Sequence, residues 1–98
     1  MATFGIELKP GAIADMDALR KFDATQIADA MQKHLQDEPT KETKSRIRRL
    51  RGITNPDYRL RVGQYRVFYT VDVETKTVVI LRVMHKDQTK AYYEELEE

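Results

Sequence analysis

The stretch YRLRVGQYRVFYTVD, residues 58–72, has the composition of a β-hairpin and predicts the centre of a β-sheet. Tyrosine, valine, phenylalanine and threonine favour strands, and a single glycine interrupts the run in its middle. Glycine at the first central position of the two-residue loop Gly63-Gln64 predicts a type II′ turn, which sets the register of both strands. The predicted cross-strand pairs are Tyr58 with Tyr69, Arg59 with Phe68, Leu60 with Val67, Arg61 with Arg66, and Val62 with Tyr65.

This register sorts the hairpin side chains onto two faces, because successive residues of a strand point to opposite sides. One face is apolar and is expected to face the core: Tyr58, Leu60, Val62, Tyr65, Val67 and Tyr69. The other face carries Arg59, Arg61, Arg66 and Phe68. Like charges directly opposite each other, as in the Arg61–Arg66 pair, destabilise a hairpin.

Clustered guanidinium groups bind phosphate well, because each can donate two parallel hydrogen bonds to it. The arginines of the hairpin therefore predict a phosphate-binding surface. The alternative is that acidic side chains from the C-terminus neutralise them as ion pairs. The candidates for that role are Glu94, Glu95, Glu97 and Glu98.

The N-terminal third is predicted to contain one strand followed by a helix hairpin. Residues 3–8 alternate in hydrophobicity and indicate a strand, whereas residues 12–22 and 23–37 show helical spacing. Asp23 and Gln26 form a capping-box pattern that predicts the start of the second helix. The apolar stripe that this hairpin should bury comprises Ile13, Met16, Leu19, Phe22, Ile27, Met31 and Leu35.

The remaining chain completes the predicted architecture. Residues 40–57 form a basic connection with a short extended piece near the sheet edge, residues 77–84 a strand, and residues 87–97 a short terminal helix. The fold class is therefore α+β: an N-terminal strand, a helix hairpin, a three-stranded antiparallel sheet and a short C-terminal helix. We expect a single domain over residues 1–98, with the helix hairpin covering one face of the sheet.

Composition and charge narrow the possible functions. The absence of cysteine excludes disulfides, thiolate nucleophiles and thiolate metal sites. The chain lacks a signal-peptide pattern and an apolar run long enough to span a bilayer, so we expect a cytoplasmic protein without a membrane partner. Residues 41–66 contain nine basic and two acidic residues, a local charge of +7 against +1 for the whole chain. Such a band suggests a polyanionic partner, although a solvated charged surface is the ordinary alternative.

Three further residues are candidates for the same site. His85 and Lys86 end the last strand, and Tyr92 follows in the terminal helix, so all three can approach the arginines of the hairpin. Each also has an ordinary explanation: a strand-end histidine, a surface lysine and a packing aromatic. Together with the arginines they predict a metal-free phosphate site with a titratable or stacking partner.

These residues resemble a known family. The segments LRG (50–52), YRLRVGQYRVFYTVD (58–72), VVILRVMHK (78–86) and Tyr92 are similar to the RelE/ParE toxins of bacterial type II toxin–antitoxin pairs, and the likeness covers essentially the whole chain. The RelE-like branch implies a metal-independent, ribosome-dependent mRNA endonuclease without a cofactor. The ParE-like branch implies a non-catalytic inhibitor of DNA gyrase, which is the alternative function.

The resemblance to the RelE-like branch also implies roles for individual residues. The catalytic set is Arg61, Arg66, Lys86 and Tyr92, and the set that binds RNA phosphate is Arg59, Arg61, Arg66 and His85. Lys86 stands where the family usually has arginine, so the bidentate phosphate contact is lost there.

The implied reaction is attack of an RNA 2′-hydroxyl on the adjacent phosphate, which yields a 2′,3′-cyclic phosphate and a free 5′-hydroxyl. Arg61, Arg66 and Lys86 would stabilise the pentavalent phosphate. Arginine is a poor base, so Tyr92, with a pKa lowered by the surrounding positive charges, is the first candidate for the base, and His85 is the second. Tyr92 is alternatively expected to stack on an RNA base.

The resemblance implies two macromolecular partners and no small-molecule cofactor. One is mRNA on the ribosome. The other is a cognate antitoxin protein with an acidic segment that folds on binding and fills grooves beside the helix hairpin. Neutralisation is expected either to cover the arginines of the hairpin or to displace the terminal helix, whose acidic end is unfavourable for the helix dipole.

Overall fold

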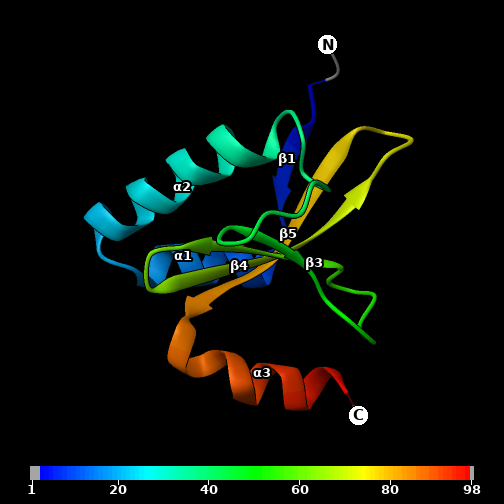
Figure 1. Cartoon of the computed structure of the whole chain (residues 1–98). Coiled ribbons are helices and arrows are strands. Elements are labelled where there is room, and N and C mark those ends of the chain that lie inside the picture. Colours follow the sequence, from blue (N-terminus) through cyan, green and yellow to red (C-terminus); the bar gives the residue numbers. More distant parts are fainter. Residues whose placement is uncertain (1–2, 98) are drawn as a thin grey trace.

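The computed structural model describes residues 3–97 and shows an α+β fold with the predicted order of elements (Figure 1). The hairpin of the opening stretch forms the centre of the fold, as strands β3 and β4. The elements are β1 (Gly5–Leu8), α1 (Pro10–Ala18), α2 (Lys21–Leu35), β2 (Ile47–Arg49), β3 (Tyr58–Val62), β4 (Tyr65–Asp72), β5 (Thr77–His85), a 3₁₀ turn (Lys86–Gln88) and α3 (Thr89–Leu96). Within these residues, the helices are too short or too polar for any of them to cross a membrane.

The sheet is larger than predicted and is mixed. Five strands lie in the order β1-β5-β4-β3-β2, with β1 parallel to β5 and the other pairs antiparallel. The predicted three-stranded antiparallel sheet is therefore its centre only. The short extended piece expected in the basic connection is β2, which pairs with β3 at one edge. The parallel β1–β5 pair joins segments far apart in sequence, and no local pattern specifies it.

The register of the hairpin agrees with the prediction at all five pairs, from Tyr58 opposite Tyr69 to Val62 opposite Tyr65. Gly63 has a φ of 57°, the positive value that a type II′ turn requires at its first central position. Arg61 therefore lies directly opposite Arg66. The turn and the hydrophobic pattern both favour this pairing. A slip by one residue would move every apolar side chain of a strand to the wrong face.

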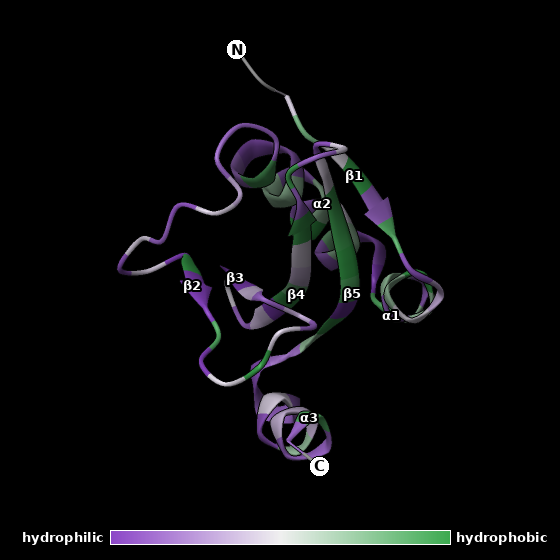
Figure 2. Cartoon of the chain, turned by 90° about the vertical axis from the view of Figure 1, so that its right-hand side faces the viewer, coloured by the Kyte–Doolittle hydropathy of each residue, from purple (hydrophilic) through white to green (hydrophobic). Residues whose placement is uncertain are grey.

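Helices cover both faces of the sheet rather than one (Figure 2). The main core lies between the sheet and the N-terminal helices and contains Ile27, Leu35, Leu60 and Tyr69. A smaller core lies on the other face, where α3 covers Phe68 and Met84. The helix hairpin covers one face, as predicted, and α3 covers the other, because Phe68 would otherwise expose a large apolar ring on the arginine side.

The helix hairpin differs from the prediction at its break. Leu19 and Arg20 are extended, so α2 begins at Lys21 and the capping box at Asp23 does not form. Asp23 instead lies in the first turn of α2, where it pairs with Arg20 at 3.4 Å and accepts a hydrogen bond from the Tyr65 hydroxyl at 3.2 Å. Because the break between the two helices lies at residues 19 and 20 and not at Asp23, the apolar side chains near it point in other directions than predicted.

This change of direction leaves two predicted core residues outside the core. Ile13 is 48% exposed and Phe22 is 69% exposed. Ile27, Met31 and Leu35 of the predicted stripe are buried as expected. Met16 and Leu19 pack against the main core as predicted, so the prediction of the stripe was wrong only at Ile13 and Phe22.

An aspartate of α1 completes the hydrogen bonding along the open part of β5. Strand β1 pairs only with residues 77–80 of β5, so the later residues lack a strand partner on that side. Asp15 accepts the Val83 backbone N–H at 2.8 Å and binds Arg82 through two contacts, at 2.7 Å to Nε and 3.1 Å to Nη2. This contact protects an otherwise unpaired sheet edge.

Replacing Asp15 with alanine should lower the free energy of unfolding by about 2 kcal/mol, because it removes charge-assisted bonds to Arg82 and leaves the Val83 N–H without its acceptor. Urea denaturation followed by circular dichroism measures the change. Asp17→Ala, at an exposed position of the same helix, is the matched control and should change stability by less than about 0.5 kcal/mol. Equal denaturation midpoints for the two variants would contradict the prediction.

Candidate phosphate-binding face

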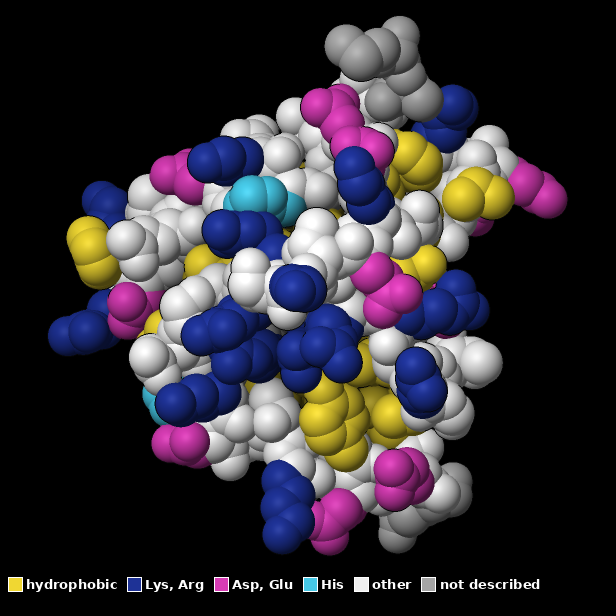
Figure 3. All heavy atoms as spheres, viewed as in Figure 1, with side chains coloured by type: hydrophobic (Ala, Val, Ile, Leu, Met, Phe, Trp, Pro, Cys, Tyr) yellow, Lys and Arg dark blue, Asp and Glu magenta, His cyan; other side chains and the backbone are white. Residues whose placement is uncertain are grey.

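Arg59, Arg61 and Arg66, which together we call the arginine face, lie on the side of the sheet away from the main core. Arg61 and Arg66 form one cross-strand pair, and Arg59 lies opposite Phe68 in the next pair with the same orientation. Arg61 is exposed, and the other two are partly buried. The space-filling view shows lysine and arginine side chains gathered across the middle of one side of the molecule (Figure 3).

The arginine face has no acidic neutralisation within residues 3–97. None of its three guanidinium groups forms a salt bridge there. The Nε atom of Arg59 is buried and has no hydrogen-bond partner among the described residues. The ion pairs considered for Glu94, Glu95 and Glu97 are therefore not formed, and Glu98 lies outside the described residues. Guanidinium groups without a carboxylate partner are suited to bind an anion.

Arg66 is held at the hairpin turn. Its Nη1 atom donates to the backbone oxygens of Gly63 and Tyr65, at 3.0 and 2.9 Å. Partial burial lowers the pKa of Arg66 below its usual value, and the charges of Arg59 and Arg61 lower it further. The three side chains are thus close enough to interact, and Arg66 keeps its charge near neutral pH because arginine titrates far above it.

Lys86 lies beside the same turn. Its backbone N–H donates to the Gln64 carbonyl at 2.7 Å, and its own carbonyl accepts from the Thr89 hydroxyl at 2.8 Å. These contacts hold the start of the 3₁₀ turn against the tip of the hairpin. The Lys86 side chain is exposed beside this turn.

His85 lies on the opposite side of the sheet from the arginine face. It is paired with Tyr65, and the two rings meet edge to face at 5.6 Å. Tyr65 packs against the main core, so His85 shares that side. The Nδ1 atom of His85 accepts the Asp87 backbone N–H at 3.1 Å and caps the following turn. The structure does not bring this predicted phosphate ligand to the arginines.

Tyr92 is a core residue in this structure. It is 8% exposed, and its ring lies 4.9 Å from Phe68 and 5.8 Å from the Arg82 guanidinium. Burial raises the pKa of Tyr92, and this effect outweighs the lowering by Arg82. The expectation that positive charges lower its pKa was wrong, because the nearest arginine is paired with Asp15 and the ring is removed from water.

One arginine that sequence analysis missed extends the arginine face. Arg48 of β2 lies directly opposite Arg59 of β3, so both side chains point to the same side of the sheet. Arg48 is exposed and forms no salt bridge within residues 3–97. The segment RIRR at residues 46–49 indicated this strand, because the apolar Ile47 between two arginines shows the alternation of apolar and polar residues that is typical of a strand.

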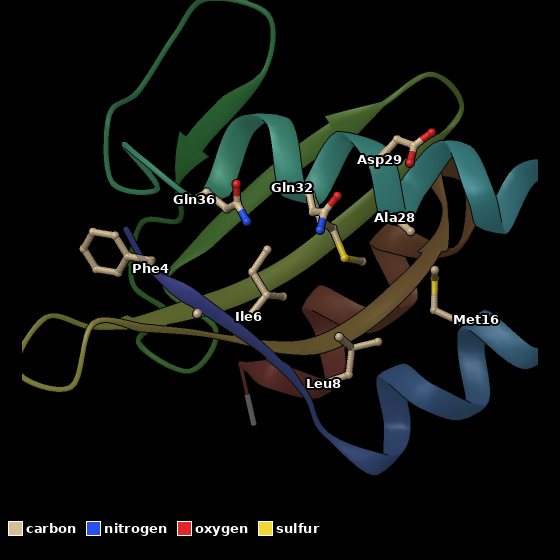
Figure 4. Close-up of a pocket in the computed structure, with 10 residues that line it drawn as sticks. Phe4, Ile6, Leu8, Met16, Ala28, Asp29, Gln32 and Gln36 are labelled. Atoms are coloured by element: carbon tan, nitrogen blue, oxygen red, sulfur yellow. The ribbon is translucent and has the colours of Figure 1, made fainter. Parts of the chain in front are cut away.

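A second surface lies beside the helix hairpin. A cavity of about 440 Å³ opens between β1, α1 and α2 (Figure 4). Phe4, Ile6 and Leu8 line it from the β1 side, and Met16 lines it from α1. The α2 side contributes polar groups, among them Asp29 and Gln32. This groove is largely apolar and follows an edge strand of the sheet.

Comparison with known proteins decides the family. Residues 6–89 match the family model described as "ParE toxin of type II toxin-antitoxin system, parDE". The chain belongs to the RelE/ParE toxin superfamily. It is thus a toxin of a type II toxin–antitoxin system, and the fold described above is that of a RelE/ParE toxin. No curated protein matches the toxin in sequence.

Solved RelE structures resemble this RelE/ParE toxin over nearly their full lengths. The RelBE2 toxin–antitoxin complex of Mycobacterium tuberculosis shares 28% identity and a TM-score of 0.74, covering 87% of this chain and 93% of that one. A double mutant of E. coli RelE in the free state shares 26% identity with a TM-score of 0.71, covering 96% and 94%. The archaeal RelE–RelB complex of Pyrococcus horikoshii shares 25% identity with a TM-score of 0.64, covering 86% of this chain and 96% of that one.

Proposed function

We propose that this toxin is a ribosome-dependent mRNA endonuclease that stops translation. The observation that carries the proposal is the arginine face, whose three guanidinium groups have no carboxylate partner within residues 3–97. Opposed arginines destabilise a hairpin, so their presence indicates a bound anion that offsets the repulsion. The likeness to RelE structures supports the same reading.

The proposed reaction needs little covalent chemistry from the protein. The RNA 2′-oxygen attacks the adjacent phosphorus, the bond to the 5′-oxygen breaks, and a 2′,3′-cyclic phosphate and a 5′-hydroxyl form. Arg61, Arg66 and Lys86 stabilise the negative charge that develops on the phosphate oxygens, and Arg59 binds the neighbouring backbone. Preorganised charge of this kind typically contributes a factor of about 100 to 1000 per group.

Proton transfer is assigned to the ribosome-bound complex. Arginine and lysine remain protonated near neutral pH, so this face supplies charge and not a base. His85 is on the other side of the sheet, and burial raises the pKa of Tyr92. If the toxin supplies positive charge and the ribosome-bound complex supplies proton transfer, a toxin with this geometry needs the ribosome for activity.

The decisive test is cleavage of a defined mRNA on purified ribosomes, with product ends identified by mass spectrometry. The proposal requires cyclic-phosphate and 5′-hydroxyl ends, and it requires that cleavage depend on ribosomes. Chelation of metal ions after complex assembly should leave the rate unchanged. Intact mRNA at toxin concentrations that arrest growth would exclude the endonuclease function.

The alternative function is inhibition of DNA gyrase, and the description of the matched family model as a ParE toxin favours it. A gyrase inhibitor would act through a protein-binding surface and would need no phosphate chemistry. Expression of the toxin followed by separate measurement of protein synthesis and of the DNA-damage response distinguishes the two. Early arrest of translation without DNA damage supports the endonuclease, and the reverse order supports gyrase.

We also propose an acidic antitoxin segment as the neutralising partner. The similar RelE structures include complexes with RelB. The apolar groove beside β1 and α2 suits the apolar side chains of such a segment, while its acidic residues complement the arginine face. Hydrogen exchange of residues 87–97 with and without antitoxin separates two modes of action: displacement of α3 raises exchange there, and simple masking of the arginines does not.

Arg48 extends the proposed RNA-binding surface from the arginine face to the edge of the sheet. Its removal should therefore weaken RNA binding without changing the rate of the chemical step. Arg48→Ala should lower affinity for mRNA-loaded ribosomes and make the plot of log affinity against log salt shallower by about one unit. Lys33→Ala, an exposed position on α2, removes the same charge on the other side of the sheet and is the control. Identical salt slopes for the two variants would show that Arg48 does not contact the RNA.

A further inference from the structure

Two methionines line the apolar groove between β1, α1 and α2 (Figure 4). Met31 is 3% exposed and belongs to the main core, whereas Met16 of α1 is only partly buried. Figure 4 shows the thioether of Met16 directed across the groove toward Ala28 of α2. The sulfur of Met16 therefore forms part of the wall that an apolar partner segment would contact.

The thioethers are the most easily oxidised side chains of this protein. The sequence contains no cysteine and no tryptophan, so an oxidant meets neither a thiol nor an indole before it reaches methionine. Three methionines lie within residues 3–97, and two of them are closed off from water: Met31 is 3% exposed and Met84 is 6% exposed. Met16 is thus the described methionine most open to a peroxide in solution.

Oxidation of this sulfur changes the chemistry of the groove wall. A sulfur lone pair attacks one oxygen of hydrogen peroxide, the O–O bond breaks, and the other oxygen leaves as water after it takes up the proton of the transferred oxygen. The sulfur loses two electrons and becomes a sulfoxide, while the peroxide is reduced. The sulfoxide is polar and accepts hydrogen bonds. An apolar partner side chain packed on Met16 would remove its oxygen from water, which costs free energy unless a donor replaces the water.

We propose that Met16 is a site of redox modification and that its conversion to the sulfoxide weakens binding of the antitoxin in this groove. The modification acts on free toxin, because a bound segment would cover the sulfur. An oxidised toxin is then harder to neutralise again, and reduction of the sulfoxide restores the apolar groove. This inference rests on the antitoxin proposed for the groove and does not depend on the endonuclease chemistry.

The test compares antitoxin affinity before and after treatment of free toxin with hydrogen peroxide. The antitoxin used is the product of the gene beside that of the toxin, and calorimetry gives the dissociation constant. Peptide mass spectrometry identifies the oxidised methionine. Peroxide should modify Met16 first and raise the dissociation constant at least about tenfold. Treatment with methionine sulfoxide reductase should return it to within about twofold of the starting value.

Two leucine substitutions of similar volume locate the effect. Met16→Leu keeps an apolar side chain that peroxide cannot oxidise, so the ratio of the dissociation constants after and before peroxide should be about one. Met84→Leu removes a thioether on the other face of the sheet and should show the same ratio as the wild-type toxin. Met16→Gln places a permanent amide in the groove and should bind antitoxin at least about fivefold more weakly without peroxide. Thermal unfolding confirms that each variant is folded.

The outcomes separate this inference from the proposed position of the antitoxin. Hydrogen exchange with and without antitoxin shows whether residues 4–8 and 28–32 become protected. If they do not, the antitoxin binds elsewhere, and this inference fails together with the proposed position. If they do become protected, the redox inference alone is overturned when oxidised Met16 leaves the affinity unchanged, or when Met31 or Met84 is oxidised first.

Discussion

Arg66→Ala is expected to lower cleavage of ribosome-bound mRNA at least about 100-fold and to abolish toxicity, because it removes a charge that the proposed function assigns to the scissile phosphate. The fold should persist. The substitution removes two hydrogen bonds to the turn, to Gly63 and Tyr65, but it also removes the repulsion from Arg61. These effects oppose each other, so the free energy of unfolding should change by less than about 1 kcal/mol.

Two further variants define what Arg66 does. Arg66→Lys retains a positive charge without the planar pair of donors and should lose less activity than the alanine variant. Lys90→Ala, an exposed position on α3, removes a charge elsewhere and should retain full activity. Cleavage rates and growth arrest are measured together with urea denaturation. Wild-type toxicity in a folded Arg66→Ala protein would rule out the arginine face as the active surface.

Phe68→Ala should have the largest effect on stability, a loss of about 3 to 5 kcal/mol, because a fully buried ring leaves a cavity in a small core. Phe68 is in contact with both Tyr92 and Tyr93, so it is the main anchor of α3 on the sheet. We expect α3 to lose its docked position before the rest of the fold is lost. Urea denaturation and hydrogen exchange of residues 89–96 measure the two effects.

The controls for Phe68 use substitutions of graded size and position. Phe68→Leu retains much of the buried volume and should cost less than the alanine variant. Val73→Ala truncates an apolar side chain that is 65% exposed and should change stability by less than about 0.5 kcal/mol. Undiminished protection of the α3 amides in Phe68→Ala would show that other contacts hold the helix. Easy release of α3 would favour antitoxin action by displacement.

Local sequence patterns were enough to predict the hairpin and its two faces. Gly63 specifies the turn, the turn specifies the register, and the alternation of side chains then places Arg59, Arg61 and Arg66 on one side. Each step depends on residues close together in the chain, so local rules suffice. The order of strands and helices followed from hydrophobic periodicity for the same reason, and the largest boundary error lies where α1 ends and α2 begins.

The residues that surround the arginine face could not be predicted in this way, because they depend on long-range packing. The parallel pairing of β1 with β5, the contact of Asp15 with Arg82, and the pairing of Arg48 with Arg59 each join distant segments. His85 and Tyr92 were expected at the site because they follow the last strand, yet the direction of a side chain depends on how β5 and α3 pack. A one-residue step along a helix turns a side chain by about 100°, so helical spacing alone did not show that the Tyr92 ring would be buried against Phe68.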